Sequence, residues 1–181
     1  MPQIAKIING WLNLPCFIFI KATGRFSDND LLGKIGAADY LPVPVKTSNR
    51  RPDIFITEDD AWIHIVDSNY NLWNKGWRKL SDSLHEMLPE VSIFACSVGD
   101  IDWSFDFSYH SSGKLQRRLI VEDPKNAKQR IVVENFGLPL AAEKDFSAIS
   151  DELEYVLSLA ASLGIKFDHK LKQMRCYQKP V

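Results

Sequence analysis

The chain has few residues with which to build cross-links or metal centres. Its 181 residues include only three cysteines, at positions 16, 96 and 176, and no Cys-x-x-Cys pair. An odd number of widely spaced cysteines argues against both a disulfide framework and a zinc module. Unpaired cysteines are typical of a reducing compartment, so we expect a cytoplasmic protein.

Long apolar runs are also missing. A membrane-spanning helix needs about 20 apolar residues, and no segment comes near that length. The apolar stretch 11–20 is interrupted by Asn13 and Pro15 and is followed by no small-x-small cleavage site. It therefore lacks the features of a secretory signal peptide. We expect no association with a membrane.

Familiar motifs for binding phosphate or for nucleophilic catalysis are absent as well. Gly33-Lys34-Ile35-Gly36 lacks the spacing of a phosphate-binding loop. Cys96 could act as a nucleophile beside His85 or His110, because a thiolate needs a nearby base. It lies within an apolar strand, however, and a small buried side chain explains it better.

The sequence gives little support for a metal site or for a nucleic-acid-binding surface. Asp100, Asp102, Asp106 and His110 could share a strand face, but they lack the glycine and the terminal glutamate of a calcium loop. The aromatic residues lie in acidic surroundings, whereas nucleic-acid surfaces mix aromatic with basic residues. We therefore expect no metal, no cofactor and no nucleic-acid partner.

The clearest pattern present is the alternation of large aromatic and small polar residues from Asp102 to Tyr109. A period of two is typical of a strand with one buried and one exposed face. We predict a buried face and an opposite polar face. The buried face holds Trp103, Phe105 and Tyr109, and the polar face holds Asp102, Ser104, Asp106 and Ser108.

A second strand, residues 115–122, predicts a hairpin with the first. A two-residue loop would oppose Asp102 to Val121, so a three-residue loop of Ser111, Ser112 and Gly113 is preferred. With this three-residue loop, apolar residues of the two strands lie opposite each other. The exception is Arg117, which lies opposite the apolar Phe107. The predicted pairs are Trp103 with Val121, Phe105 with Leu119, Tyr109 with Leu115, Asp106 with Arg118 and Ser108 with Gln116.

Apolar and β-branched runs predict five further strands. Their ranges are 15–23, 53–57, 61–67, 91–98 and 130–134. Three helices are expected from cap residues and from apolar stripes. They run from Ser27 to about Ala38, from Asn69 to Leu88 with a stripe of Trp73, Trp77, Leu80 and Leu84, and from Ile149 to Leu163. Residues 41–52 read as a loop.

This order predicts a single α+β domain over residues 1–181, with residues 166–181 as a basic tail or an edge strand. Its core is a mostly antiparallel sheet of six or seven strands packed by two main amphipathic helices.

Charge is segregated along the chain although the net charge is −1. Residues 1–51 carry +4, residues 52–160 carry −9 and residues 161–181 carry +4. Either the basic ends fold back on the acidic body, or the acidic part faces a basic partner. In the second case the candidate contacts are the hairpin tip Glu58, Asp59 and Asp60 together with Asp102 and Asp106.

The stretch 109–143 resembles small bacterial immunity-type proteins that pair with polymorphic or contact-delivered toxins. The resemblance consists of a Ser112-Gly113 turn, the charged strand 114–118, and Gly137-Leu138-Pro139-Leu140 with Glu143 before a terminal helix. It implies a non-enzymatic cytoplasmic protein that neutralises a toxin, with a basic toxin domain as its partner. The alternatives are an enzyme with an unrecognised, family-specific site and a structural or regulatory interaction module.

Overall fold

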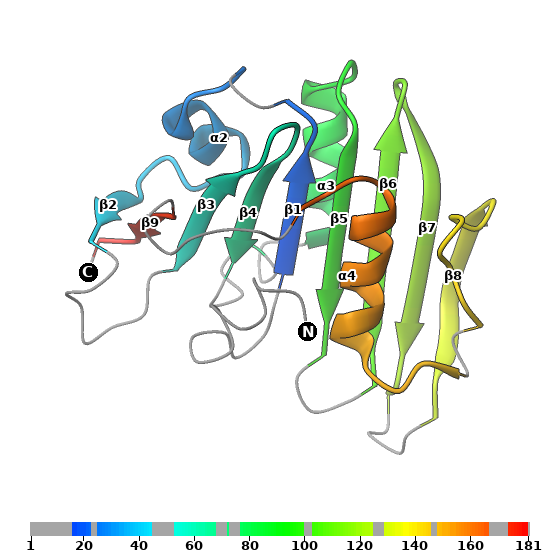
Figure 1. Cartoon of the computed structure of the whole chain (residues 1–181). Helices are drawn as coiled ribbons and strands as arrows, with labels where there is room; N and C mark the ends of the chain where they lie inside the picture. The colour runs from blue at the N-terminus through cyan, green and yellow to red at the C-terminus, as the bar shows by residue number, and fades with distance from the viewer. Residues whose placement is uncertain are drawn as a thin grey trace.

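The computed structural model describes residues 16–22, 25–44, 53–67, 72, 77–99, 103–124, 129–145, 148–166 and 174–180, with the backbone alone at 77–79. These residues form one sheet of nine strands in the order β2-β9-β3-β4-β1-β5-β6-β7-β8, and all neighbours pair antiparallel (Figure 1). The strands are β1 (Cys16–Ile20), β2 (Leu41–Val43), β3 (Ile54–Glu58), β4 (Ile63–Asp67), β5 (Ile93–Val98), β6 (Phe105–Ser111), β7 (Lys114–Glu122), β8 (Ile131–Gly137) and β9 (Arg175–Gln178). The helices are α2 (Asp28–Lys34), α3 (Trp77–Met87) and α4 (Glu152–Ser162).

The predicted antiparallel α+β fold is therefore found, but the prediction of six or seven strands and two helices is wrong. The sheet has nine strands and the described chain has three short helices. The two additional strands, β2 and β9, have only three and four residues and pair with each other. Strands of this length are too short to show a period of two in the sequence. Their stability comes from neighbouring strands that are distant in sequence.

The sheet is covered on both faces. Helix α4 packs on one face, whereas α2 and α3 lie on the other (Figure 1). The α4 face is rich in phenylalanine, with Phe19, Phe94 and Phe107 buried there. The opposite face is built from isoleucine and leucine, including Leu84 of α3. Because both faces are buried, the central strands carry apolar residues on both faces, as the sequence of β4 predicts, and the polar residues of β4, His64 and Asp67, are buried as well.

The helix start that cap residues predict at Ser27 is confirmed, whereas the last helix, expected from Ile149, begins at Glu152. Ser27 caps α2 and forms a capping box, in which Asp30 N donates to Ser27 Oγ at 3.2 Å and Ser27 N donates to Asp30 Oδ2 at 3.1 Å. Asp151 caps α4 by accepting from Glu154 N at 2.8 Å. In the predicted helix 69–88, Leu84 is buried and Leu80 is half-buried. The side chains of Trp73 and Trp77 lie outside the described residues.

The β6–β7 hairpin is confirmed, but its predicted register is wrong. The turn has two residues, Ser112 and Gly113, with φ of 52° and 72°, and Ser111 pairs with Lys114. A bulge at Gln116 then shifts the pairing by one residue. As a result Phe105 lies opposite Val121, and Asp106 lies opposite Ile120 instead of Arg118. Without the bulge, a hairpin with this two-residue turn would place apolar residues of one strand opposite polar residues of the other. The bulge restores the pairing of apolar with apolar residues.

The two faces of β6 also differ from the prediction. Phe105 is buried as expected, but Trp103 is 38% exposed and Tyr109 is half-buried. The polar face is not exposed to solvent, because α3 covers it: Ser81 Oγ and Ser108 Oγ lie 2.7 Å apart. Asp102 lies outside the described residues. None of the helices within the described part of the chain is long and apolar enough to cross a membrane.

Candidate protein-binding surface

Exposed apolar side chains are concentrated at the β8 edge of the sheet. Strand β8 is the last strand, and within the described residues β7 is the strand that pairs with it. Seven large hydrophobic residues of the described chain are exposed, and four of them fall within residues 131–138. We call these four side chains the β8 surface. They are Ile131 at 53%, Val133 at 52%, Phe136 at 49% and Leu138 at 86% exposure.

A buried arginine holds the end of β8 against β7. Arg117 and Glu143, whose side chains are 2% and 7% exposed, pair through two contacts, Nε to Oε2 at 2.9 Å and Nη2 to Oε1 at 2.5 Å. Arg117 Nη1 also donates to Asn135 Oδ1 at 2.6 Å and to Phe136 O at 2.8 Å. One guanidinium therefore ties the segment 135–143 to β7, which explains the apparent misfit of Arg117 among apolar residues.

The chain turns back over the sheet at Gly137. Its φ is +81°, and a Cβ at this position would lie 2.0 Å from Gln116 O. Only glycine fits both the backbone conformation and the close approach. Beyond this turn, Glu143 Oε2 accepts from Leu140 N at 2.9 Å, which closes the loop. The turn leaves Leu138 the most exposed residue of the β8 surface.

The start of β8 is fixed by a second arginine. Arg130 contacts Glu152 in the first turn of α4 and donates to Ile149 O at 2.8 Å. Its guanidinium carbon lies 4.8 Å from the ring centre of Trp103, the exposed aromatic before β6. Both ends of β8 are thus anchored by charged contacts with the body of the domain. The apolar residues between them remain exposed on an ordered strand.

The predicted acidic contacts do not form one surface. Glu58, Asp59 and Asp60 lie at the β3–β4 turn, whereas Asp106 lies in β6, beyond β1 and β5 in the strand order. Asp106 is only 5% exposed and accepts from Ser97 Oγ at 3.0 Å. Asp102 lies outside the described residues.

At the β3–β4 turn the acidic side chains contact basic residues of the same chain. Glu58 pairs with Arg175 at 3.1 Å, and Asp60, 84% exposed, pairs with Lys166 at 2.5 Å. Asp59 accepts from the amides of Ala61, Trp62 and Lys166 at 2.7 to 2.8 Å. Burial by itself raises the pKa of Asp59, but these hydrogen bonds outweigh it and lower the pKa below its usual value. The basic C-terminal part therefore folds against the acidic body.

A buried polar layer separates α3 from β6 and β7. The rings of His85 and His110 stack at 4.6 Å, and His110 Nε2 lies 3.3 Å from Asp82 Oδ1, which also pairs with Arg118. Burial, and then the neighbouring His85, lower the pKa of His110 to about 4. His110 is therefore neutral at pH 7 and only 1% exposed, so the geometry gives it no route to a substrate.

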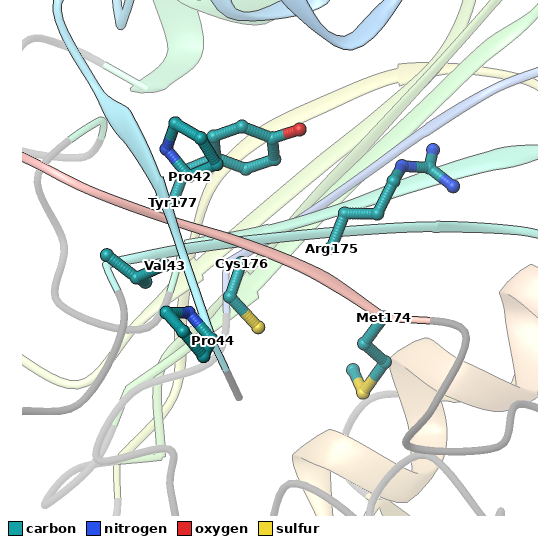
Figure 2. A pocket seen from close by; sticks show the side chains of 7 residues that line it. All are labelled: Pro42, Val43, Pro44, Met174, Arg175, Cys176 and Tyr177. Carbon is teal, nitrogen blue, oxygen red and sulfur yellow. The ribbon is translucent and has the colours of Figure 1, made fainter. Parts of the chain in front are cut away.

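A recess of about 430 Å³ lies at the opposite edge of the sheet, between β2 and β9 (Figure 2). Figure 2 shows Cys176 and Met174 on one side of β9, with Arg175 and Tyr177 on the other. Burial raises the pKa of the Cys176 thiol to about 11, so it is protonated and weakly nucleophilic at pH 7. Arg175 is bound by Asp28 at 2.6 Å. The recess thus offers no activated chemical group.

Comparisons with known proteins give no match to a family model, to a curated protein or to a solved structure. Sequence reasoning placed a strand at 130–134 but did not identify its exposed apolar side chains as a surface. The signal available was the return of apolar residues at Phe136 and Leu138, past the predicted end of the strand at Glu134. Nothing in that run distinguishes an edge strand from a buried one.

Proposed function

We propose that this protein is a non-catalytic binding protein that captures a partner protein at the β8 surface. The observation that carries the proposal is the concentration of exposed apolar residues within 131–138 on an edge strand. Exposed apolar patches on ordered surfaces commonly mark sites of protein interaction. An open strand edge adds unpaired backbone groups to such a patch.

The immunity-type resemblance supports a bacterial toxin as the class of partner. The residues that carry it include Gly137, which makes the turn after β8, and Glu143, which binds Arg117. Both shape the loop that presents Leu138. A cytoplasmic location is part of the proposal, and the three buried free cysteines are consistent with it.

The enzyme alternative would draw on Asp82, His85 and His110, because burial and then the neighbouring His85 lower the pKa of His110. A catalytic base needs to reach its substrate within hydrogen-bonding distance. Because α3 covers His110, this use would require α3 to move. The β8 surface needs no rearrangement, so we prefer the binding function.

Tagged protein expressed in the native host tests the proposal. We expect the wild-type chain to co-purify with one stoichiometric protein, and the variant Val133→Lys to lose it. Leu41→Lys at the β2 edge is the matched control, because Leu41 is also exposed, at 57%. Circular dichroism checks that both variants are folded. A partner retained by Val133→Lys, or lost equally from both variants, would overturn the proposal.

A further inference from the structure

We infer that the partner supplies an extended, basic segment that pairs with β8 as a tenth strand of the sheet. This inference rests on the proposed function, because it names the chemistry of the occupant of the β8 surface. It combines three observations on β8, namely an outer edge with which no other strand of the described residues pairs, its bulge and the exposed carboxylate of Glu134.

The open backbone favours strand addition. Alternate residues of an edge strand direct their N–H and C=O groups away from the sheet, where another strand can bind them. The seven residues of β8 are ordered by β7 on one side and by the Arg117 and Arg130 contacts at its ends. The binding strand is thus already formed, and little conformational entropy is lost in β8 when a partner pairs with it.

The bulge makes this edge selective. Ile120 pairs with Glu134 and Val121 pairs with Val132, so Val133 is an extra residue in β8. A bulge interrupts regular pairing and is a common protection against indiscriminate edge-to-edge association. A partner strand therefore pairs regularly with the part of β8 after the bulge, residues 134–137. Side chains of the partner then meet Phe136 and Leu138.

Charge indicates a basic partner. Glu134 is the one charged side chain within β8, and it is 40% exposed. Its ion pair with Arg118 is long, at 3.8 Å, since Arg118 also binds Asp82. The carboxylates near the two ends of β8, Glu143 and Glu152, are already paired with Arg117 and Arg130. A cationic side chain opposite Glu134 would be attracted to it. A second copy of this chain would instead add another Glu134 side chain to this edge.

A display library of strand-forming peptides tests the inference. Apolar residues are kept at every second position, the positions between are randomised, and selection uses the wild-type chain with counter-selection on Phe136→Lys, because Phe136 lies within the paired segment and is 49% exposed. We expect the selected peptides to carry Lys or Arg at one preferred position. Their affinity should fall at least tenfold on Glu134→Lys, and an acidic residue at the preferred position should restore it. Asp60→Lys is the control, because Asp60 is exposed at a distant turn.

Three outcomes would overturn the inference. They are selected peptides without a basic preference, no enrichment over counter-selection, and dimerisation of the chain through β8 in sedimentation experiments. Failure here is distinguishable from failure of the proposed function. If the native partner is still lost from Val133→Lys but no strand peptide is selected, the β8 surface binds a protein by another mode.

Discussion

The two edges of the sheet are built differently. Strand β2 has three residues with Pro42 at its centre, which removes a backbone donor, and Pro44 follows directly. Strand β8 has seven residues, no proline and three exposed apolar side chains, and a fourth, Leu138, follows directly. A short, proline-containing edge resists pairing with other chains, whereas a long apolar edge invites it. The difference favours β8 over β2 as the edge that we propose for partner binding.

The contacts behind the two edges differ as well. At the β8 edge, Arg117 and Glu143 are both buried, whereas Arg175 at the β2 edge is 38% exposed in its pair with Asp28. Breaking a buried pair leaves an uncompensated charge in the interior. The β8 edge is therefore held more rigidly by its ion pair than the β2 edge, and rigidity suits a surface that is preformed for binding.

The largest expected effect is that of Glu143→Gln, which leaves Arg117 buried without its carboxylate. We expect a loss of about 3 to 5 kcal/mol in the free energy of unfolding, measured by urea denaturation. Asp28→Asn at the β2 edge should cost only about 1 kcal/mol, because solvent screens that pair. Equal losses from the two variants would show that the two edges are held alike.

Gly137→Ala should cost about 2 to 3 kcal/mol, because it combines a positive φ with a Cβ too close to Gln116 O. Gly33→Ala in α2 is the matched control. A Cβ there meets nothing within 4 Å, so we expect unchanged or slightly increased stability. A neutral Gly137→Ala in thermal denaturation would contradict the tight turn after β8.

His110 should make the stability of the β8 half of the sheet depend on pH. Its pKa is about 4 in the folded protein against 6.5 ordinarily, so between these values the unfolded chain binds more protons. Stability should therefore fall as pH falls from about 6.5 to about 4, by about 2 kcal/mol after allowance for screening. His110→Phe should remove this part of the pH dependence. An identical pH profile in wild type and variant would refute the assignment.

Val133→Lys should change stability least, by about 0.5 kcal/mol or less, because Val133 is exposed. Leu41→Lys should behave in the same way. The two variants should separate only in partner binding, which Val133→Lys weakens and Leu41→Lys leaves intact. Isothermal titration with the co-purified partner measures this difference, and equal affinities would remove the distinction between the edges.

Local patterns predicted most of the elements, because caps and apolar periods act over a few residues. Ser27 begins a helix as expected, and the central strands lie where apolar runs predict them. Strand β2 lies in a segment that was expected to be a loop, and β9 lies within residues 166–181, which were expected to be a basic tail or an edge strand. Strand β9 is instead an internal strand between β2 and β3, because both short strands are stabilised by distant segments. The hairpin register failed because a bulge at Gln116 compensates for a tighter turn, and nothing in the local pattern marks it.

The candidate site was less predictable than the fold. Sequence reasoning treated charge as the signal for a surface, but Asp106 is buried beside Ser97, and Glu58 and Asp60 pair with Arg175 and Lys166. Exposure of an apolar side chain depends on strand order, and strand order depends on contacts across the whole chain. The position of β8 at the end of the sheet is such a property.

Amide hydrogen exchange on the free chain and on its complex with the co-purified partner tests most directly whether β8 is the docking edge. We predict that alternate amides of β8 become strongly protected in the complex, because the partner's carbonyl groups bind them, while the amides of β2 are unchanged. Exchange that is unaltered in β8, with new protection at β2 or at the β3–β4 turn, would contradict the account.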